Sequence, residues 1–450
     1  MDRGLEESPE AKTAGSAAVE ATRGGEARTT KWSWVEPSVW TERMLAALKT
    51  GVKGGRWYSL MDKVWNRANL RRSFEKVKAK KGAAGTDHVT VEEFERQVER
   101  HLEQLERQLR EGTYRPQAIR RVYIPKPGSR EKRPLGIPTV RDRVVQGALR
   151  HVLEPIFERD FAEQSYGFRP GRGCKNALRR VEHLLKDGHT WVLDADLRKY
   201  FDTIPHEALM TRIRAKVADG RVLGLIEAFL HQGVLEGLET WTPEEGTPQG
   251  AVLSPLLANL YLDPLDQMMF DAGFEMVRYA DDFVILCRSA EEAQQALQLV
   301  RLWTTEAGLT LHPEKTRIVE ATQKGGFDFL GYHFERGMRW PRQKSTAKLK
   351  DAIRSKTRRA NGHSMAAIVA DLNRTLRGWF EYFKHSHWTT FGSLDRWVRM
   401  RLRSILRKRH KLKGRGRGAD HQRWPNAYFT DLRLLSLAAA HVSVCQSARR

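Results

Sequence analysis

The sequence feature that most constrains the fold is an apolar stretch over residues 276–287 that two adjacent acids interrupt. Apolar residues on both sides predict two buried strands, so Ala280, Asp281 and Asp282 must form the tight turn of a hairpin. Two neighbouring carboxylates at the tip of a buried hairpin repel each other unless a cation neutralises them. Aspartate also favours turns for conformational reasons, so the pair taken alone is compatible with an ordinary turn.

A third acid, Asp196, makes a metal-binding role for this pair the expected one. The segment 191–202 begins as a strand whose alternation places Asp194 and Asp196 on one face and apolar residues on the other. Mg²⁺ binds a few carboxylates together with substrate phosphates and water. Asp196, Asp281 and Asp282 therefore form the set expected for phosphoryl or nucleotidyl transfer with two metal ions.

Helix signals surround these strands. Ser254 followed by Pro255 is typical of a helix N-cap and first turn, and Ser289 and Glu292 have the spacing of a capping box. The order of strand, helix, hairpin and helix predicts a palm-like α+β domain.

The first third of the chain contains three kinds of segment. Residues 1–31 hold six acids, five basic residues and no aromatic residue, which predicts a disordered leader. Residues 32–111 have apolar side chains at helical spacing. Residues 122–138 predict a hairpin with Lys126 and Arg133 on its flanks, although charged turns are most often simply solvated.

The charge of the chain points to a polyanionic partner. The 450 residues carry a formal charge of +23, and residues 342–417 alone hold 22 Lys or Arg against four acids. Solubility does not need such a surplus, so nucleic acid is the expected partner. Three widely spaced cysteines supply neither a zinc motif nor a disulfide framework, which favours a reducing compartment. No apolar run approaches the roughly 18 residues of a membrane span, so a cytoplasmic protein with no membrane partner is expected.

Several sequence blocks resemble those of reverse transcriptases. Tyr279-Ala-Asp-Asp282 resembles their Tyr-x-Asp-Asp box, and Asp196 falls where their first metal-binding aspartate lies. The blocks similar to the group II intron subfamily are 82–87, 165–172, 247–250, 308–315 and 329–332, and 376–383 is similar to the signature of its maturase (X) domain. No His-Asn-His endonuclease pattern with zinc-binding cysteines follows residue 417. Over roughly 60–412, the chain resembles group II intron-encoded reverse transcriptase/maturases of the endonuclease-lacking type.

This resemblance implies an α+β fold with right-hand polymerase architecture. A reverse transcriptase domain of fingers and palm would precede an α-helical thumb or maturase domain. The expected units are a leader at 1–31, an N-terminal helical extension with the start of the fingers at 32–111, fingers and palm at 112–335, the thumb at 342–412, and a basic C-terminal segment at 413–450 as a candidate DNA-binding remnant.

The resemblance also implies roles for individual residues. Two Mg²⁺ ions, with Mn²⁺ as a substitute, would be held by the catalytic residues Asp196, Asp281 and Asp282. Lys126 and Arg133 would contact the phosphates of the dNTP, and Gln249 and Gly250 would line its pocket. Phe201 would act as a steric gate against a ribose 2′-hydroxyl. The primer grip would include Leu330 and Gly331.

The maturase motif implies binding of the group II intron RNA for splicing and retrohoming. The RNA template–DNA primer duplex and target DNA are further expected partners, with nucleoid association when the protein is bound to DNA. The expected RNA-binding residues, which should project from helices whose apolar side chains face a core, are Arg377, Arg399, Arg401, Arg403, Arg407, Lys408 and Arg409. Two alternatives stay open, namely an RNA-binding maturase without polymerase activity and a retron, defence or CRISPR-associated reverse transcriptase. The sequence leaves the oligomeric state open.

Overall fold

The computed structural model describes residues 32–125, 132–413 and 418–447. Its first part is helical, as the sequence predicts, and consists of α2 (Glu42–Thr50), α3 (Met61–Val64), α4 (Arg67–Ala79), α5 (Val91–Arg96) and α6 (Val98–Glu111). The Asn66 side chain caps α4, and Thr90 with Glu93 forms a capping box at α5. Helix α4 packs along α7 (Val140–Glu158), a helix that is buried over most of its length.

A four-stranded sheet with the order β2-β1-β4-β5 forms the fingers. Its strands are β1 (Ile119–Pro125), β2 (Lys132–Ile137), β4 (Val234–Glu236) and β5 (Glu239–Trp241). Strands β1 and β2 pair antiparallel from Arg120 opposite Ile137 to Pro125 opposite Lys132, so the predicted hairpin is confirmed. Lys126 and the leader 1–31 lie outside the described residues.

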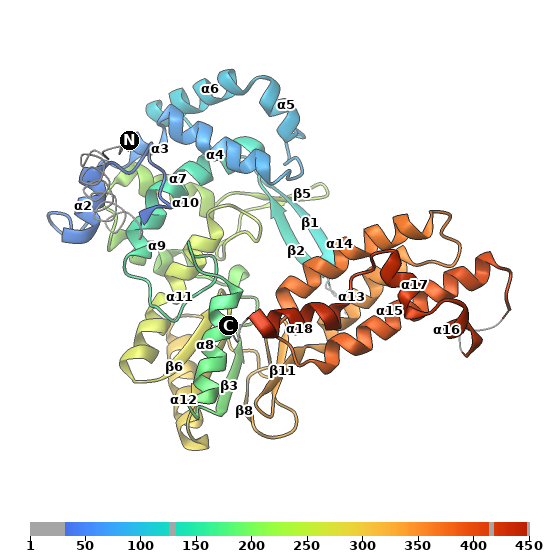
Figure 1. Ribbon diagram of the computed structural model, residues 1–450. Coiled ribbons are helices and arrows are strands. Elements are labelled where there is room, and N and C mark those ends of the chain that lie inside the picture. The colour runs from blue at the N-terminus through green and yellow to red at the C-terminus, as the bar shows by residue number, and fades with distance from the viewer. Residues whose placement is uncertain (1–31, 126–131, 414–417, 448–450) are drawn as a thin grey trace, which may run out of the picture.

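The palm is an antiparallel sheet with the order β6-β7-β3-β8. Its strands are β3 (Trp191–Asp196), β6 (Glu275–Tyr279), β7 (Asp282–Cys287) and β8 (Arg317–Glu320). Between β3 and β4 the chain forms a 3₁₀ turn (Tyr200–Asp202), α9 (His206–Arg214) and α10 (Gly220–Leu230). Figure 1 shows α9 and α10 between the palm and the N-terminal helices, and α9 packs against α10.

The two faces of the palm sheet have different coverings. Leu193 and Ala195 lie in the main core with α11 (Ser254–Asp271) and α12 (Ala290–Glu306). Val192 and Val284 lie on the other face, in a core that includes residues of α8 (Cys174–Lys186). The predicted alternation of β3 is therefore confirmed, and Asp194 and Asp196 share the α8 side.

The helix that begins at Ser254 is also confirmed, but this serine does not cap it. The Ser254 hydroxyl donates to the Pro248 carbonyl at 2.8 Å, and no side chain caps the first turn. Ser289 does cap α12, by accepting from the Glu292 amide at 3.2 Å.

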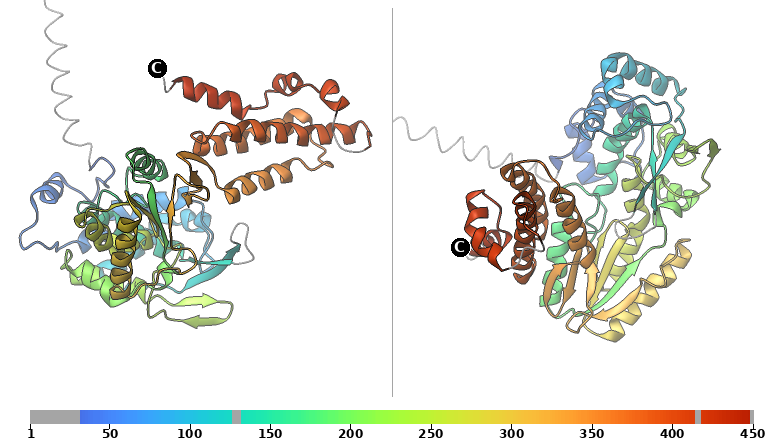
Figure 2. Two further views of the ribbon diagram at one scale, coloured as in Figure 1. Left: turned by 90° about the horizontal axis from the view of Figure 1, so that it is seen from below. Right: turned by 90° about the vertical axis from the view of Figure 1, so that its right-hand side faces the viewer.

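The thumb projects from the palm as a helical unit (Figures 1 and 2). A small sheet of β9 (Phe327–Phe329), β10 (Tyr332–Glu335) and β11 (Met338–Pro341) leads into it. Its helices are α13 (Gln343–Lys356), α14 (Met365–Phe383), α15 (Thr389–Arg409), α16 (Ala419–Arg423), α17 (Asn426–Asp431) and α18 (Leu437–Ser447). The described fold thus has the expected α+β part followed by an α-helical part, and none of its described helices is long and apolar enough to cross a membrane.

The expected boundary near residue 412 does not separate two packed units. Trp424, Phe429 and Leu437 are buried in the same core as the apolar residues of α13, α14 and α15. These three large side chains need the thumb core to leave water, so the described residues from 418 onward extend the thumb.

A buried ion pair anchors the hairpin that carries Asp281 and Asp282. The Arg278 side chain is 1% exposed. Its guanidinium binds the Asp266 carboxylate of α11 through two hydrogen bonds, from Nε to Oδ1 at 2.7 Å and from Nη2 to Oδ2. The same guanidinium donates to the Ala280 carbonyl at 2.8 Å. Because Ala280 has a φ of +62°, this bond holds a residue of the turn in a conformation that non-glycine residues rarely adopt.

Two further contacts complete the guanidinium's shell. Its nitrogens donate to Asn259 Oδ1 at 2.9 Å and to the Ser165 hydroxyl at 2.8 Å. The Asn259 amide in turn donates to the Gly167 carbonyl at 2.7 Å. A Cβ on Gly167 would lie 2.2 Å from the Ala280 amide nitrogen, so only glycine lets this segment lie against the turn.

We expect Arg278→Met to destabilise the protein by about 3–5 kcal/mol, because it leaves the Asp266 carboxylate buried without its partner. The double variant Arg278→Met/Asp266→Leu should recover much of that loss, since apolar residues of similar volume tolerate burial. The matched control is Arg214→Met, which breaks the solvent-exposed pair of Arg214 with Glu227 and should cost far less, because water screens an exposed ion pair. Urea unfolding monitored by circular dichroism measures all three variants, and equal losses for Arg278→Met and Arg214→Met would contradict the anchoring role.

Candidate active site

The three predicted catalytic carboxylates come together at one end of the palm sheet. Asp196, the last residue of β3, is directly opposite Asp282, the first residue of β7. Asp282 also pairs with Tyr279 across the turn, which leaves Asp281 at its tip. Side chains directly opposite each other in antiparallel strands have Cβ atoms about 4.5–5.5 Å apart, so Asp196 and Asp282 point to the same space.

Burial and mutual repulsion raise the pKa values of the carboxylates at this end of the sheet. Burial and the neighbouring carboxylates, first Asp194 and then Asp281 and Asp196, raise the pKa of Asp282 to about 7. Burial also raises the pKa of Asp281, with a smaller contribution from Asp196. Asp194 has its pKa raised to about 6 by burial, although the Arg317 guanidinium opposes this. A cation between these groups would stabilise their charged forms.

A lysine neutralises part of this charge. Lys315 Nζ lies 2.6 Å from Asp196 Oδ2. The segment that carries it lies alongside β3, since the His312 amide donates to the Asp196 carbonyl at 2.7 Å and the Arg198 amide donates to the Thr310 carbonyl at 2.8 Å. The block 308–315 thus brings an ammonium group to the end of β3.

The donor chemistry fits divalent cations. Within residues 32–125, 132–413 and 418–447, no three His, Cys, Asp or Glu side chains already form a metal cage. Carboxylate oxygens are nevertheless the ligands that hard divalent ions prefer, and such ions typically complete their shell with substrate phosphates and water. The raised pKa of Asp282 and the ion pair of Lys315 with Asp196 mark the place as one that attracts positive charge.

The expected nucleotide pocket lies where the fingers meet the palm. The Gly136 amide of β2 donates to the Gln249 carbonyl at 2.7 Å. Gly250 has a φ of +108°, and a Cβ there would lie 2.5 Å from the Gly136 carbonyl oxygen. Glycine at 250 therefore permits the close contact between the 247–250 loop and the fingers hairpin.

Of two further nucleotide-binding candidates, Phe201 borders the same loop and Arg133 lies on the fingers strand β2. The Phe201 carbonyl accepts from the Thr247 amide at 2.6 Å, and its half-buried ring packs against Tyr200. Arg133 is exposed on β2, and its positive charge lowers the pKa of Asp281 against the larger effect of burial. Arg133 thus acts electrostatically on Asp281, Phe201 contacts the 247–250 loop, and Lys126 lies outside the described residues.

The expected primer grip is a turn held by the thumb. Leu330 and Gly331 have φ values of +47° and +84°. The Tyr382 hydroxyl of α14 donates to the Leu330 carbonyl at 2.7 Å, and the Ser345 hydroxyl of α13 donates to the Gly331 carbonyl at 3.1 Å. The position of this turn therefore depends on the seating of both thumb helices.

The expected RNA-binding cations of the thumb differ in burial and in their partners. Arg403 is 2% exposed and donates to the Trp424 carbonyl at 3.0 Å, and Arg407 pairs with the buried Asp420 at 2.7 Å. The expectation that these two face phosphate is wrong, because α16 and α17 cover that side of α15. Arg401 is half-buried and donates to Thr357. Of the other expected RNA-binding cations, Arg399 is half-buried and Arg377, Lys408 and Arg409 are exposed, although Arg409 also donates to the carbonyls of Asn361 and His363.

The sequence analysis missed the residues that hold the site together. Arg278 and Asp266 lie within apolar stretches, where a single charge carries no recognisable signal except its position directly before the Tyr-Ala-Asp-Asp turn. Lys315 was noted only as part of a block, and its contact with Asp196 spans 119 residues of sequence.

Comparisons with known proteins agree with this geometry. A family model for reverse transcriptase (RNA-dependent DNA polymerase) matches residues 124–334, and one for the group II intron maturase-specific domain matches residues 346–424. Protein YkfC of Escherichia coli K12 is 34% identical over 56% of this chain and 76% of its own length. The group II intron-encoded protein LtrA of Lactococcus lactis is 41% identical over 40% of this chain and 30% of its own length.

Among solved structures, a partial Cas6-RT-Cas1–Cas2 complex is similar with 26% identity and a TM-score of 0.35, covering 55% of this chain and 41% of that one. Both parts of the chain match their family models in the order that the fold shows, the reverse transcriptase part before the maturase part. The chain belongs to the group II intron reverse transcriptase/maturase family, whose enzyme class is RNA-directed DNA polymerase.

Proposed function

We propose that this protein copies RNA into DNA at the carboxylate cluster and binds its intron RNA through the thumb. The observation that carries the first part is the register of the palm sheet, which sets Asp196 opposite Asp282 with Asp281 at the turn between β6 and β7. Such a cluster raises the pKa of its own members, and the polymerase reaction needs cations at the point where phosphate charge develops.

Two Mg²⁺ ions are the cofactors in this proposal, with Mn²⁺ as a substitute. Asp196, Asp281 and Asp282 would hold them, and the bound ions supply charge stabilisation of the transferring phosphoryl group and its leaving group. Lys315 would exchange its contact with Asp196 for the incoming phosphates, since an ammonium group and a metal ion compete for the same carboxylate.

The dNTP would lie between the fingers hairpin and the 247–250 loop. Arg133, together with Lys126, would contact its phosphates. Gln249 and Gly250 would line its pocket, and Phe201 would exclude a ribose 2′-hydroxyl. Support for this placement comes from the contact of Gly136 with Gln249, which joins fingers and palm at this point.

The primer–template duplex would follow the palm to the thumb, past the turn at Leu330 and Gly331. The intron RNA would be bound by the remaining surface cations of the thumb, which favour phosphate by releasing its counterions. Splicing, retrohoming and a target DNA, with the nucleoid as the place of action, follow in this proposal from that RNA partner. If the protein binds intron RNA but does not synthesise DNA, it is an RNA-binding maturase without polymerase activity. If it synthesises DNA but does not bind intron RNA, it is a defence-type reverse transcriptase.

We expect Asp281→Ala and Asp282→Ala each to lower DNA synthesis by more than about a thousandfold, because a lost metal carboxylate removes about 4 kcal/mol of transition-state stabilisation. Binding to structured intron RNA should stay nearly unchanged, since the thumb is intact. Asp271→Ala, at the exposed end of α11, is the control and should retain synthesis. Primer extension with RNA template measures the effect, and extension at the control's rate by the Asp281/Asp282 double variant would refute the site.

Phe201→Ala should raise the incorporation of ribonucleotides relative to deoxyribonucleotides by about 10- to 200-fold, the range that a small apolar change in a pocket allows. The removed ring provides steric overlap with the 2′-hydroxyl, so selectivity should change more than the rate with dNTPs. Phe270→Ala is the matched control, because that ring is exposed on α11. Single-nucleotide extension with dNTP and rNTP gives the ratio, and an unchanged ratio would assign Phe201 to packing alone.

Replacing Arg377, Arg399 and Lys408 by Gln should lower the salt slope of intron RNA binding by about two to three, because each neutralised phosphate releases counterions. Arg403→Gln is the informative control, since its buried guanidinium faces Trp424 and Asn426. That control should lose thermal stability while its slope stays at the wild-type value. Binding measured over a range of salt concentrations tests both variants, and a reduced slope for Arg403→Gln alone would reverse the assignment.

A further inference from the structure

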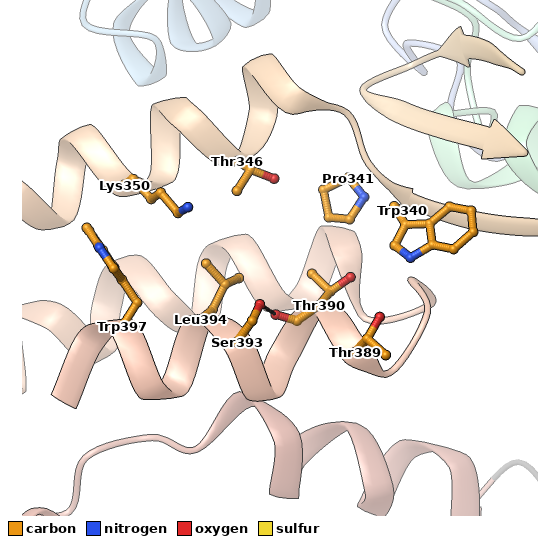
Figure 3. A pocket seen from close by; sticks show the side chains of 9 residues that line it. All are labelled: Trp340, Pro341, Thr346, Lys350, Thr389, Thr390, Ser393, Leu394 and Trp397. Atoms are coloured by element: carbon orange, nitrogen blue, oxygen red, sulfur yellow. Dashed lines mark hydrogen bonds between the residues drawn. The ribbon is translucent and has the colours of Figure 1, made fainter. Parts of the chain in front are cut away.

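A pocket of about 440 Å³ opens in the thumb, between the end of β11, α13 and the first half of α15. We call it the thumb pocket. Figure 3 shows Trp340 and Trp397 at its opposite ends, with Thr346 and Lys350 from α13 facing Thr390 and Ser393 from α15. Its volume lies within the range of about 300–1,000 Å³ that is typical of ligand sites. No part of the catalytic cluster lines it, so the polymerase site does not account for it.

The chemistry of the lining is selective. It combines two indoles, several hydroxyl groups and one lysine, and no acid is among the lining residues that the structure describes. Lys350 Nζ lies 5.8 Å from the centre of the Trp397 ring, and the Arg354 guanidinium lies 5.7 Å from it. One end of the pocket therefore presents an aromatic ring beside two cations, which suits a group that has both a flat ring and a negative charge.

A second observation at the other end points to the same kind of ligand. The Trp340 and His387 rings lie 5.5 Å apart, and His387 lies 5.5 Å from the Trp388 ring. Trp388 is 68% exposed, the most exposed tryptophan among the large apolar side chains found at the described surface. The Trp388 indole is thus exposed to solvent at the start of α15, next to the His387 and Trp340 rings. An exposed indole can stack on a nucleic-acid base.

The pocket also lies next to the path proposed for nucleic acid. Pro341 lines it, and the amide of the following residue, Arg342, donates to the Gly331 carbonyl at 2.9 Å. The His387 amide donates to the Arg339 carbonyl at 2.8 Å, which fixes the start of α15 against β11. The pocket is thus one residue along the chain from the contact that holds the expected primer-grip turn.

We propose that the thumb pocket binds an unpaired nucleotide of single-stranded RNA. The base stacks on the indoles at the Trp340 and Trp388 end, the hydroxyls of Thr390 and Ser393 meet polar atoms of the base or the ribose, and a phosphate lies near Lys350. A base inside a duplex is covered by its neighbours, so only an unpaired one can enter. This inference rests on the proposed RNA binding by the thumb and names a site for it.

Two matched pairs of variants, and one variant that fills the pocket, distinguish RNA binding by the pocket from general electrostatic attraction. Lys350→Gln removes the cation that lines the pocket, and Lys348→Gln removes an exposed cation from the same helix with an identical change of charge. Ser393→Trp fills the pocket from an exposed position on α15, and Trp388→Ala removes the exposed platform. Trp241→Ala, an exposed indole of the fingers, is the matched control for Trp388→Ala.

The experiment measures binding of the full chain to an RNA oligonucleotide of about 12 nucleotides, the same sequence as DNA, and the same RNA as a duplex. Ser393→Trp and Trp388→Ala should each weaken single-stranded RNA binding by about tenfold, the loss of one stacked base, and leave duplex binding unchanged. Lys350→Gln should weaken it more than Lys348→Gln. A zero-length photocrosslink from 4-thiouridine RNA should map to the peptide that contains Trp388.

The pocket would be overturned if Trp388→Ala and Lys350→Gln bound single-stranded RNA as well as their controls do and Ser393→Trp bound it as well as the wild type does. A crosslink confined to other peptides would also overturn it. Equal affinity for the DNA oligonucleotide would overturn the assignment to RNA. These failures are distinct from failure of the proposed function, which requires that the wild-type protein neither bind intron RNA nor extend a primer.

Discussion

The buried pair of Arg278 and Asp266 is the interaction on which the rest of this structure depends. It joins strand β6 to helix α11, and the same guanidinium holds the carbonyl of Ala280 in the turn. A fully desolvated charge is costly unless every polar atom near it has a partner, and Asn259 and Ser165 provide the remaining acceptors. The strained turn is therefore held from the interior, and Asp281 and Asp282 are placed before any ligand binds.

The end of the palm sheet that carries Asp196, Asp281 and Asp282 is a negative site in a strongly positive protein. The raised pKa of Asp282 records the cost of assembling carboxylates around it, and Lys315 offsets part of this cost at Asp196. The carboxylates thus attract cations, while the exposed positive charge of the thumb attracts phosphate. The turn at Leu330 and Gly331 connects the two regions, because its carbonyls accept hydrogen bonds from α13 and α14.

Local periodicity predicted most of the fold and the position of the candidate catalytic acids. Alternation in β3 and the apolar arms of the hairpin suffice to bring Asp196 and Asp282 to the same end of a sheet, and the register confirms that they are opposite each other. Helical spacing predicted that α15 has an apolar face, yet it could not show that α16 and α17 cover part of its polar face. For that reason Arg403 and Arg407 were assigned to RNA, whereas their partners lie in the chain itself. The role of Arg278 was likewise hidden, because its contacts with Ser165 and Asn259 are set by tertiary packing.

The central claim is that Asp196, Asp281 and Asp282 form a site for divalent cations that a nucleotide completes. A crystal structure of the protein with primer–template, a non-hydrolysable dNTP analogue and Mn²⁺ tests it most directly, because anomalous scattering locates the manganese without reference to the protein chain. The account predicts manganese peaks in contact with these three carboxylates, and Lys315 Nζ moved away from the 2.6 Å contact with Asp196. Manganese bound elsewhere, or an intact ion pair of Lys315 with Asp196 beside a bound nucleotide, would contradict it.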